Sequence, residues 1–114
     1  MTKKSPTQYL PLTHTTFYIL ISLTTPLHGY GIMQKVEEMS NGDVILGPGT
    51  LYGALSKLEK QKIISKTDED HERRKCYVLT KLGKQVVKLE WDRLQKLVEI
   101  TRNSVENMEV TKHL

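Results

Sequence analysis

The spacing of hydrophobic residues changes along the chain, and each change marks a predicted structural element. The first apolar cluster comprises Phe17, Leu20, Ile21 and Leu23. This cluster predicts a helix from Thr13 that is buried on much of its circumference. Pro26 ends that helix, because the residue before a proline is pushed out of helical dihedral angles. Residues 1–11 are polar and include two prolines, so they predict a loosely ordered arm.

A second amphipathic segment follows His28-Gly29-Tyr30-Gly31, in which we expect His28 to shape the turn. Its apolar face is formed by Ile32, Val36 and Met39, and its polar face by Gln34, Lys35, Glu37 and Glu38. This spacing is that of a helix. Residues 41–43 break it, and the short apolar run at 44–46 predicts a brief extended segment.

A third helix is predicted from Pro48, which suits the first helical position. Its inward stripe consists of Leu51, Leu55 and Leu58. The opposite face presents Thr50, Gly53, Lys57 and Lys60, with Tyr52 at its flank. A helix with apolar backing and small or cationic outer groups can enter a DNA major groove.

Two segments rich in β-forming residues follow, at 63–67 and 75–79, on either side of a charged stretch at 68–74. This arrangement predicts an antiparallel hairpin with a charged tip, which is a wing. The tip combines Arg73, Arg74 and Lys75 with an acidic half formed by Asp68, Glu69, Asp70 and Glu72. A basic triplet can probe phosphates or the minor groove, and we expect the acidic half to point away from DNA.

Helical character returns after Thr80, a good N-cap, and continues to about Asn107. Within it, a heptad-like seam is formed by Val87, Trp91, Leu94, Val98, Thr101, Val105 and Met108. A long helix cannot bury such a seam against itself, so it needs a partner helix. The expected partner is the same helix of a second copy, which makes the protein a homodimer.

Together these elements predict a mainly α (α+β) fold: a winged helix-turn-helix with a two-stranded β wing and a long C-terminal dimerisation helix. The expected organisation is an arm at 1–11, a DNA-binding domain at 12–80 and the dimerisation helix at 81–114. A chain of 114 residues has room for one packed domain. Its net charge of +4 modestly favours a polyanionic partner.

Cysteine usage and hydropathy bear on location. The single cysteine, Cys76, allows no intrachain disulfide and suits a reducing compartment. The polar first residues carry no secretory signal, and the longest apolar run, at 17–23, is too short to span a bilayer. We therefore expect a cytoplasmic protein without membrane association.

Several motifs in order carry a more specific signal. They are His28-Gly29-Tyr30-Gly31, then Gly49-Thr50-Leu51-Tyr52 with Leu55 and Leu58-Glu59, then Arg73-Arg74-Lys75-Cys76-Tyr77-Val78-Leu79-Thr80 with Gly83. Over roughly residues 15–85 the chain resembles the PadR family of transcriptional regulators. Two positions depart from the family pattern: Gln61-Lys62 replaces the usual glycine after the recognition helix, and Cys76 replaces an aromatic residue of the wing.

The resemblance implies a regulator whose partner is double-stranded DNA. It places Thr50, Tyr52, Gly53 and Lys57 on the DNA-facing helix, and Arg73, Arg74 and Lys75 in the wing. From the residues alone, Tyr52 can equally be a core or rim aromatic. Lysines at 57 and 60 can simply form a solvated helix face.

Trp91 has two interpretations. As an interface anchor it needs no ligand, and we favour that interpretation. Alternatively it forms an aromatic wall for a planar effector between subunits, an arrangement that resembles drug-sensing PadR relatives.

The combined prediction is a homodimeric repressor that binds a pseudo-palindromic operator and is released by a small-molecule effector. The main alternative is a winged-helix adaptor that binds another protein, since fold alone does not fix function. A metal-sensing regulator is a weaker alternative, because the four histidines and Cys76 show no helical or CxxC ligand spacing. We expect no cofactor, no bound metal and no enzymatic activity, since nucleotide-binding and hydrolase motifs are absent from the sequence.

Overall fold

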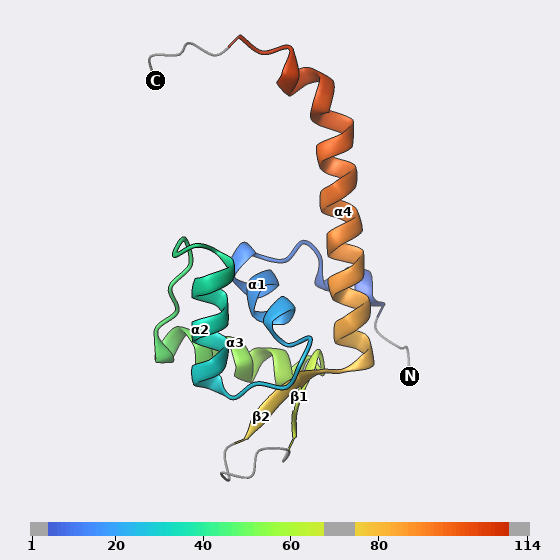
Figure 1. The fold of residues 1–114 in the computed structure, drawn as a ribbon. Helices are drawn as coiled ribbons and strands as arrows, with labels where there is room; N and C mark the ends of the chain where they lie inside the picture. The colour runs from blue at the N-terminus through green and yellow to red at the C-terminus, as the bar shows by residue number, and fades with distance from the viewer. Residues whose placement is uncertain (1–4, 68–74, 110–114) are drawn as a thin grey trace.

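The computed structural model describes residues 5–67 and 75–109. A compact unit of helices and one β-hairpin carries a long final helix that extends well beyond it (Figure 1). The elements in chain order are η1 (Pro6–Tyr9), α1 (His14–Ser22), α2 (Gly29–Met39), α3 (Pro48–Lys60), β1 (Ile64–Thr67), β2 (Cys76–Leu79) and α4 (Lys81–Glu106). This confirms the predicted mainly helical winged fold with a long C-terminal helix.

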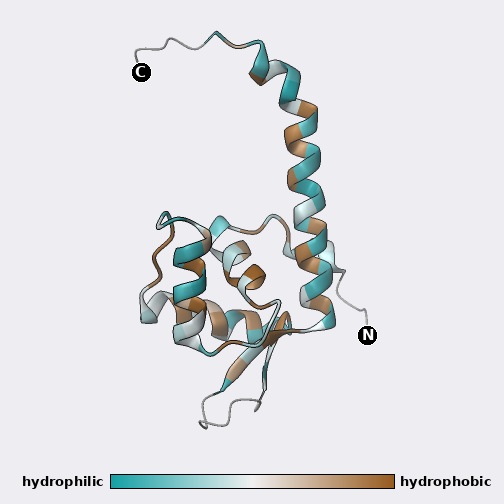
Figure 2. Cartoon of the chain, in the orientation of Figure 1, coloured by the Kyte–Doolittle hydropathy of each residue, from teal (hydrophilic) through white to brown (hydrophobic). Residues whose placement is uncertain are grey.

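The hydrophobic core lies between the first three helices and the hairpin. Its fully buried side chains include the predicted inward residues of α2 and α3, such as Ile32, Val36 and Leu51. The remaining members of the core cluster are Ile19, Leu20, Leu23, Leu46, Leu55, Leu58, Ile63, Ile64, Tyr77 and Leu79. Apolar residues thus converge on one centre, while the outward face of α2 is hydrophilic and the exposed length of α4 carries both kinds of residue (Figure 2).

Three helices begin with a side chain that accepts a backbone N–H of the first turn, as an N-cap does. The Thr13 hydroxyl accepts from Thr16, the Nδ1 atom of His28 from Gly31, and the Thr80 hydroxyl from Gly83. The predicted roles of His28 and Thr80 are therefore confirmed. Helix α3 has no capping side chain and instead begins with Pro48, which lacks an N–H and so removes one of the donors that a helix start leaves unpaired.

The wing strands pair in antiparallel fashion, with Ile64 opposite Leu79 and Thr67 opposite Cys76. Leu27 forms a one-residue antiparallel bridge with β2, on the side away from β1, and exchanges two backbone hydrogen bonds with Tyr77. The charged tip at 68–74 lies outside the described residues. Residues 44–46, predicted to be extended, belong to no strand; the Ser40 hydroxyl accepts the Val44 N–H there at 2.9 Å.

The described part of the arm differs from the loosely ordered segment expected from the sequence. Residues 6–9 form η1, which packs beside α4, and Tyr9 contacts the edge of the core. The Leu12 N–H donates to the Glu90 carboxylate of α4 at 2.7 Å. The arm is therefore held between the domain and the base of α4.

A hydrogen-bonded joint connects α4 to the end of α3 and to the wing. The Thr80 N–H donates to the Ile63 carbonyl at 3.0 Å, and its hydroxyl donates to the Lys62 carbonyl at 2.6 Å. Gly83 packs directly on this segment, since an added Cβ would lie 2.1 Å from the Ile63 carbonyl oxygen. The direction of α4 is thus fixed relative to α3.

Candidate nucleic-acid interface

The outer face of α3 is exposed and contains small and cationic residues. Thr50, Gly53, Lys57 and Lys60 are all exposed. An added Cβ at Gly53 would meet no atom within 4 Å, and the same is true of Gly49 at the start of the helix. A nucleic-acid backbone or base edge can therefore approach this helix closely along its small residues.

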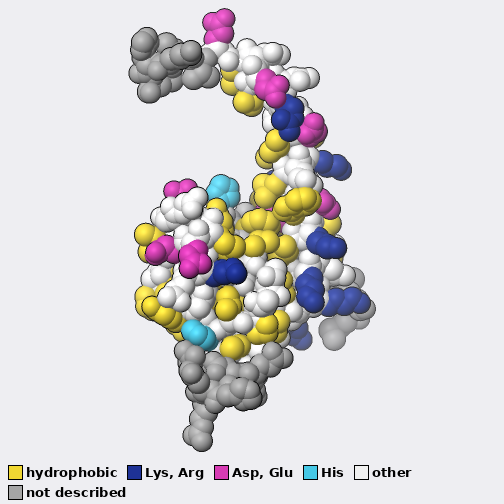
Figure 3. All heavy atoms as spheres, in the orientation of Figure 1, with side chains coloured by type: hydrophobic (Ala, Val, Ile, Leu, Met, Phe, Trp, Pro, Cys, Tyr) yellow, Lys and Arg dark blue, Asp and Glu magenta, His cyan; other side chains and the backbone are white. Residues whose placement is uncertain are grey.

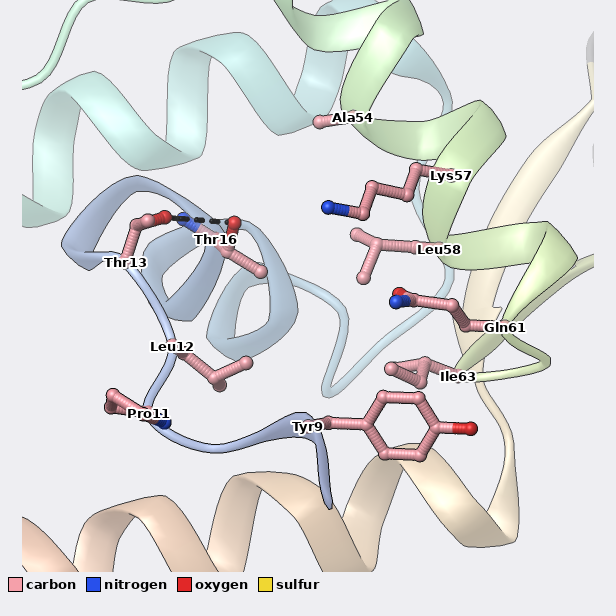
Figure 4. A pocket seen from close by; sticks show the side chains of 10 residues that line it. All are labelled: Tyr9, Pro11, Leu12, Thr13, Thr16, Ala54, Lys57, Leu58, Gln61 and Ile63. Carbon is pink, nitrogen blue, oxygen red and sulfur yellow. Dashed lines mark hydrogen bonds between the residues drawn. The ribbon is translucent and has the colours of Figure 1, made fainter. Parts of the chain in front are cut away.

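Lys57 lies at the side of this face that is turned toward α1. Its side chain extends from α3 toward α1, over a cavity of about 170 Å³ between α3, α1 and the arm (Figure 4). Gln61 projects into the same cavity, opposite Leu12 and Tyr9 of the arm (Figure 4). The predicted face therefore divides: Gly53 and Lys60 are exposed on the outer side, whereas Lys57 lies at the boundary with α1.

Tyr52 flanks α3 on the opposite side and connects it to α2. Its side chain is 48% exposed, so it is a rim residue and not part of the core. The absence of a side chain at Gly29 makes this position possible, because an added Cβ there would lie 2.2 Å from the Tyr52 hydroxyl. The tyrosine thus presents its ring edge and hydroxyl at the junction of α2, α3 and the wing.

The wing contributes one described basic residue of the predicted triplet. Lys75 is exposed immediately before β2, whereas Arg73 and Arg74 lie outside the described residues. On β1, Lys66 pairs with Glu59 of α3 at 3.8 Å, which balances the acidic charge nearest this surface. Burial, with smaller contributions from Glu59 and Tyr52, raises the pKa of Tyr77, so this phenol stays protonated.

The predicted seam of α4 splits into an inner and an outer part. Val87 packs against the core of its own chain. Beyond it the helix leaves the domain, and Trp91, Val98 and Val105 are 51%, 55% and 58% exposed. Leu94 and Thr101 are half-buried. Figure 3 shows hydrophobic side chains gathered along one edge of α4 and basic side chains on the other.

Sequence reasoning missed Glu90, which is 1% exposed on α4. Its carboxylate accepts the Leu12 N–H and two N–H groups of Arg93, through Nε and Nη2. The hydrogen bond from Arg93 above all holds the pKa of Glu90 below its usual range, despite burial. The sequence does carry one indication of this burial: Glu90 follows the buried Val86 by four residues and so lies on the same inward face of α4.

Residues 5–67 and 75–109 contain no group of three or more His, Cys, Asp or Glu side chains arranged to hold a metal ion. In the same parts of the chain, no helix has the length and hydrophobicity needed to cross a bilayer.

The fold and this surface agree with what the comparison with known families finds. The family model described as "Transcriptional regulator PadR-like family" matches residues 19–89, from α1 into the first turns of α4. The chain belongs to the PadR-like family of transcriptional regulators. Membership makes it a DNA-binding regulator, in keeping with the exposed face of α3 and the wing.

Related proteins extend this result. A PadR family transcription regulator from Clostridium difficile has a TM-score of 0.67 at 21% identity, covering 82% of this chain and 99% of its own. A PadR-like transcriptional regulator from Bacillus cereus has a TM-score of 0.66 at 24% identity, covering 83% and 93%. These similarities concern the fold. An uncharacterised 37.1 kDa protein in a transposon of Streptomyces fradiae is 36% identical over 72 residues, which are 63% of this chain and only 20% of that protein.

Proposed function

We propose that this PadR-like regulator is a repressor that binds a pseudo-palindromic operator as a homodimer and is released by a small-molecule effector. In this proposal the α3 helices read base edges with Thr50, Tyr52 and Gly53. The cationic residues position the protein on phosphates, with Lys57 and Lys60 acting from α3 and Arg73, Arg74 and Lys75 from the wing.

The exposed apolar face of α4 carries the proposal. Trp91, Val98 and Val105 repeat at steps of seven residues and remain half-exposed in the single chain. Burying them against a second α4 releases water from three large side chains at one seam, with Leu94 and Thr101 between them. Leu97 and Ile100 are also exposed and lie off this line.

Pairing through α4 gives the DNA contacts a fixed spacing. Each α3 is joined to its α4 through the Thr80 and Gly83 joint, so the two-fold axis of the α4 pair also relates the two recognition helices. Two helices that enter successive major grooves require half-sites about 34–36 Å apart. Phosphate contacts by several lysines and arginines make the affinity fall steeply with salt.

Effector release requires a ligand that binds one dimer geometry better than the other. Trp91 lines an open cavity of about 410 Å³ together with Phe17 and Leu94, at the point where α4 leaves the domain. A planar aromatic ligand fits such a lining. We nevertheless assign Trp91 first to packing between the paired helices, since interface tryptophans need no ligand.

Oligomeric state and DNA binding of matched variants test the proposal. Val98→Asp places a charge in the seam and is expected to give monomers by light scattering, with operator affinity lost in a gel-shift assay. Ile100→Asp is the control, because this more exposed residue lies about 200° around the helix from Val98 and should leave the dimer intact. A Val98→Asp protein that remains dimeric would remove the seam from the proposal.

The DNA face is tested by Lys60→Ala and by the pair Arg73→Ala/Arg74→Ala, with Lys88→Ala on α4 as a charge-matched control. Each DNA-face variant should weaken operator binding. It should also reduce the magnitude of the slope of log K, the logarithm of the binding constant, against the logarithm of salt concentration by about 0.9 per lost phosphate contact. Binding of the wild-type protein to another protein, with no shift of any DNA fragment from its own upstream region, would favour the adaptor function instead.

A further inference from the structure

We infer that Glu90 is a positioning residue for DNA binding, because through the arm it holds the side chain of Lys57 in one direction. The inference rests on the proposed role of Lys57 as a phosphate contact. It adds a second connection between α3 and α4, separate from the joint at Thr80 and Gly83. The arm here means its described part with the residue that follows, residues 5–12.

Glu90 clamps the arm to α4. One of its carboxylate oxygens accepts the Leu12 N–H at 2.7 Å and the Nη2 group of Arg93 at 3.2 Å. The other oxygen accepts from Nε of Arg93. Hydrogen bonds to an ionised acceptor are stronger than those between neutral groups. Within residues 5–67 and 75–109 this is the only hydrogen bond between the arm and α4, so the buried carboxylate fixes where the arm lies.

On its other side the arm forms one wall of the cavity beside α3. Tyr9 and Leu12 line this cavity and pack against the edge of the core. Lys57 and Gln61 of α3 line the cavity from the opposite side (Figure 4). An arm released from Glu90 would leave the cavity open and take away the wall that faces Lys57.

The direction of Lys57 depends on this packing. In the parts of the chain that the structure describes, its ammonium group makes no ion pair and no hydrogen bond. Its side chain instead extends over the cavity toward α1, with the ammonium group at the exposed rim (Figure 4). A lysine stem often lies along apolar surface in this way. Fixing a free lysine on a partner costs conformational entropy, so a lysine already held by the arm binds a phosphate more favourably.

The clamp lies beside the surface of α4 that is proposed to pair. Glu90 and Arg93 immediately precede Trp91 and Leu94 of the seam. A shift of α4 at this level moves the carboxylate that holds the arm and so reaches Lys57, even where the joint at the start of α4 stays intact. An effector that favours a shifted α4 would therefore weaken DNA binding by this route.

Combining Glu90→Leu with Lys57→Ala tests the connection, with gel shifts of a duplex fragment from the protein's own upstream region. Leucine fills the buried position but accepts no hydrogen bond, so the arm is released. Alone, Glu90→Leu should weaken binding about threefold per subunit, or about tenfold for a dimer. In the Lys57→Ala background the same change should cost less than about twofold, since no lysine remains to be positioned. In the Lys60→Ala background, the matched control on α3, it should still cost about tenfold.

Two further variants separate positioning from a general loss of stability. Glu90→Gln keeps an acceptor for the Leu12 N–H and should bind DNA as the wild type does, although its charge is lost. Tyr9→Ala leaves the clamp intact but removes part of the cavity wall. It should weaken binding only where Lys57 is present, and it carries the same test should Glu90→Leu fail to fold. Amide hydrogen exchange at Leu12 should become faster in Glu90→Leu and not in Tyr9→Ala.

The outcomes distinguish this inference from the proposed function. Losses of affinity in Glu90→Leu and Tyr9→Ala that are as large without Lys57 as with it would overturn the positioning role alone. Unchanged affinity of both variants would overturn it too. Binding of Lys57→Ala as tight as that of the wild type would instead remove Lys57 from the proposed DNA face, and the inference with it.

Discussion

Replacing Gly83 with alanine should damage the joint between the DNA-reading unit and α4. The added Cβ would lie 2.1 Å from the Ile63 carbonyl oxygen and 3.1 Å from its carbonyl carbon. Ordinary contacts of this kind are about 1 Å longer, and the neighbouring atoms are backbone that is already hydrogen-bonded to Thr80. The start of α4 must therefore move away from β1.

The magnitude follows from opposing effects. Alanine in place of glycine favours a helix by up to about 1 kcal/mol. Overpacking of this kind costs about 1–3 kcal/mol, and loosening the two Thr80 hydrogen bonds to residues 62 and 63 costs about 1 kcal/mol each. The net loss is about 2–4 kcal/mol, which lowers the unfolding temperature by roughly 8–16 °C in a domain of this size.

Thermal unfolding followed by circular dichroism, at equal protein concentrations, measures this change. Gly53→Ala is the control, because an added Cβ there meets open space and should raise the unfolding temperature slightly. A Gly83→Ala protein that melts at or above the wild-type temperature would refute the close contact on which the joint depends.

Two further substitutions test individual side chains. Lys62 has a φ of 62°, so Lys62→Gly should stabilise the fold by about 0.5–1 kcal/mol in urea unfolding; a loss of stability would contradict strain at this turn. Glu90→Gln should cost about 1–2 kcal/mol at pH 7, because the Leu12 N–H and Arg93 lose a charged acceptor. Since folding lowers the pKa of Glu90, its contribution is complete above the unfolded value of about 4.3 and disappears as the pH falls through the folded value. The wild type and Glu90→Gln should therefore converge in stability in acid; a constant difference from pH 7 to pH 3 would contradict this role.

The sequence was most informative where a residue type has one dominant structural use. Pro48 at a helix start, Thr80 as an N-cap and the leucine stripe of α3 follow from local rules that hold in most folds. Gln61-Lys62 stands where the PadR pattern usually has a glycine after the recognition helix. Lys62 adopts the left-handed conformation that such a glycine would provide.

Features that depend on packing between distant segments could not be predicted in this way. Burial of Glu90 depends on the Leu12 N–H, 78 residues earlier in the chain. The orientation of Lys57 toward α1 depends on the arm that closes the cavity beside it. Periodicity places a side chain on a helix face but does not identify the segment that covers that face.

Hydroxyl-radical footprinting on a DNA fragment selected from genomic DNA, combined with the mass of the complex, shows whether two α4-paired subunits bind one duplex. A dimer that reads both half-sites gives two chains per duplex and two protected patches whose centres lie about 10–10.5 base pairs apart, related by a two-fold axis. One chain per duplex, or a single protected patch, would contradict it.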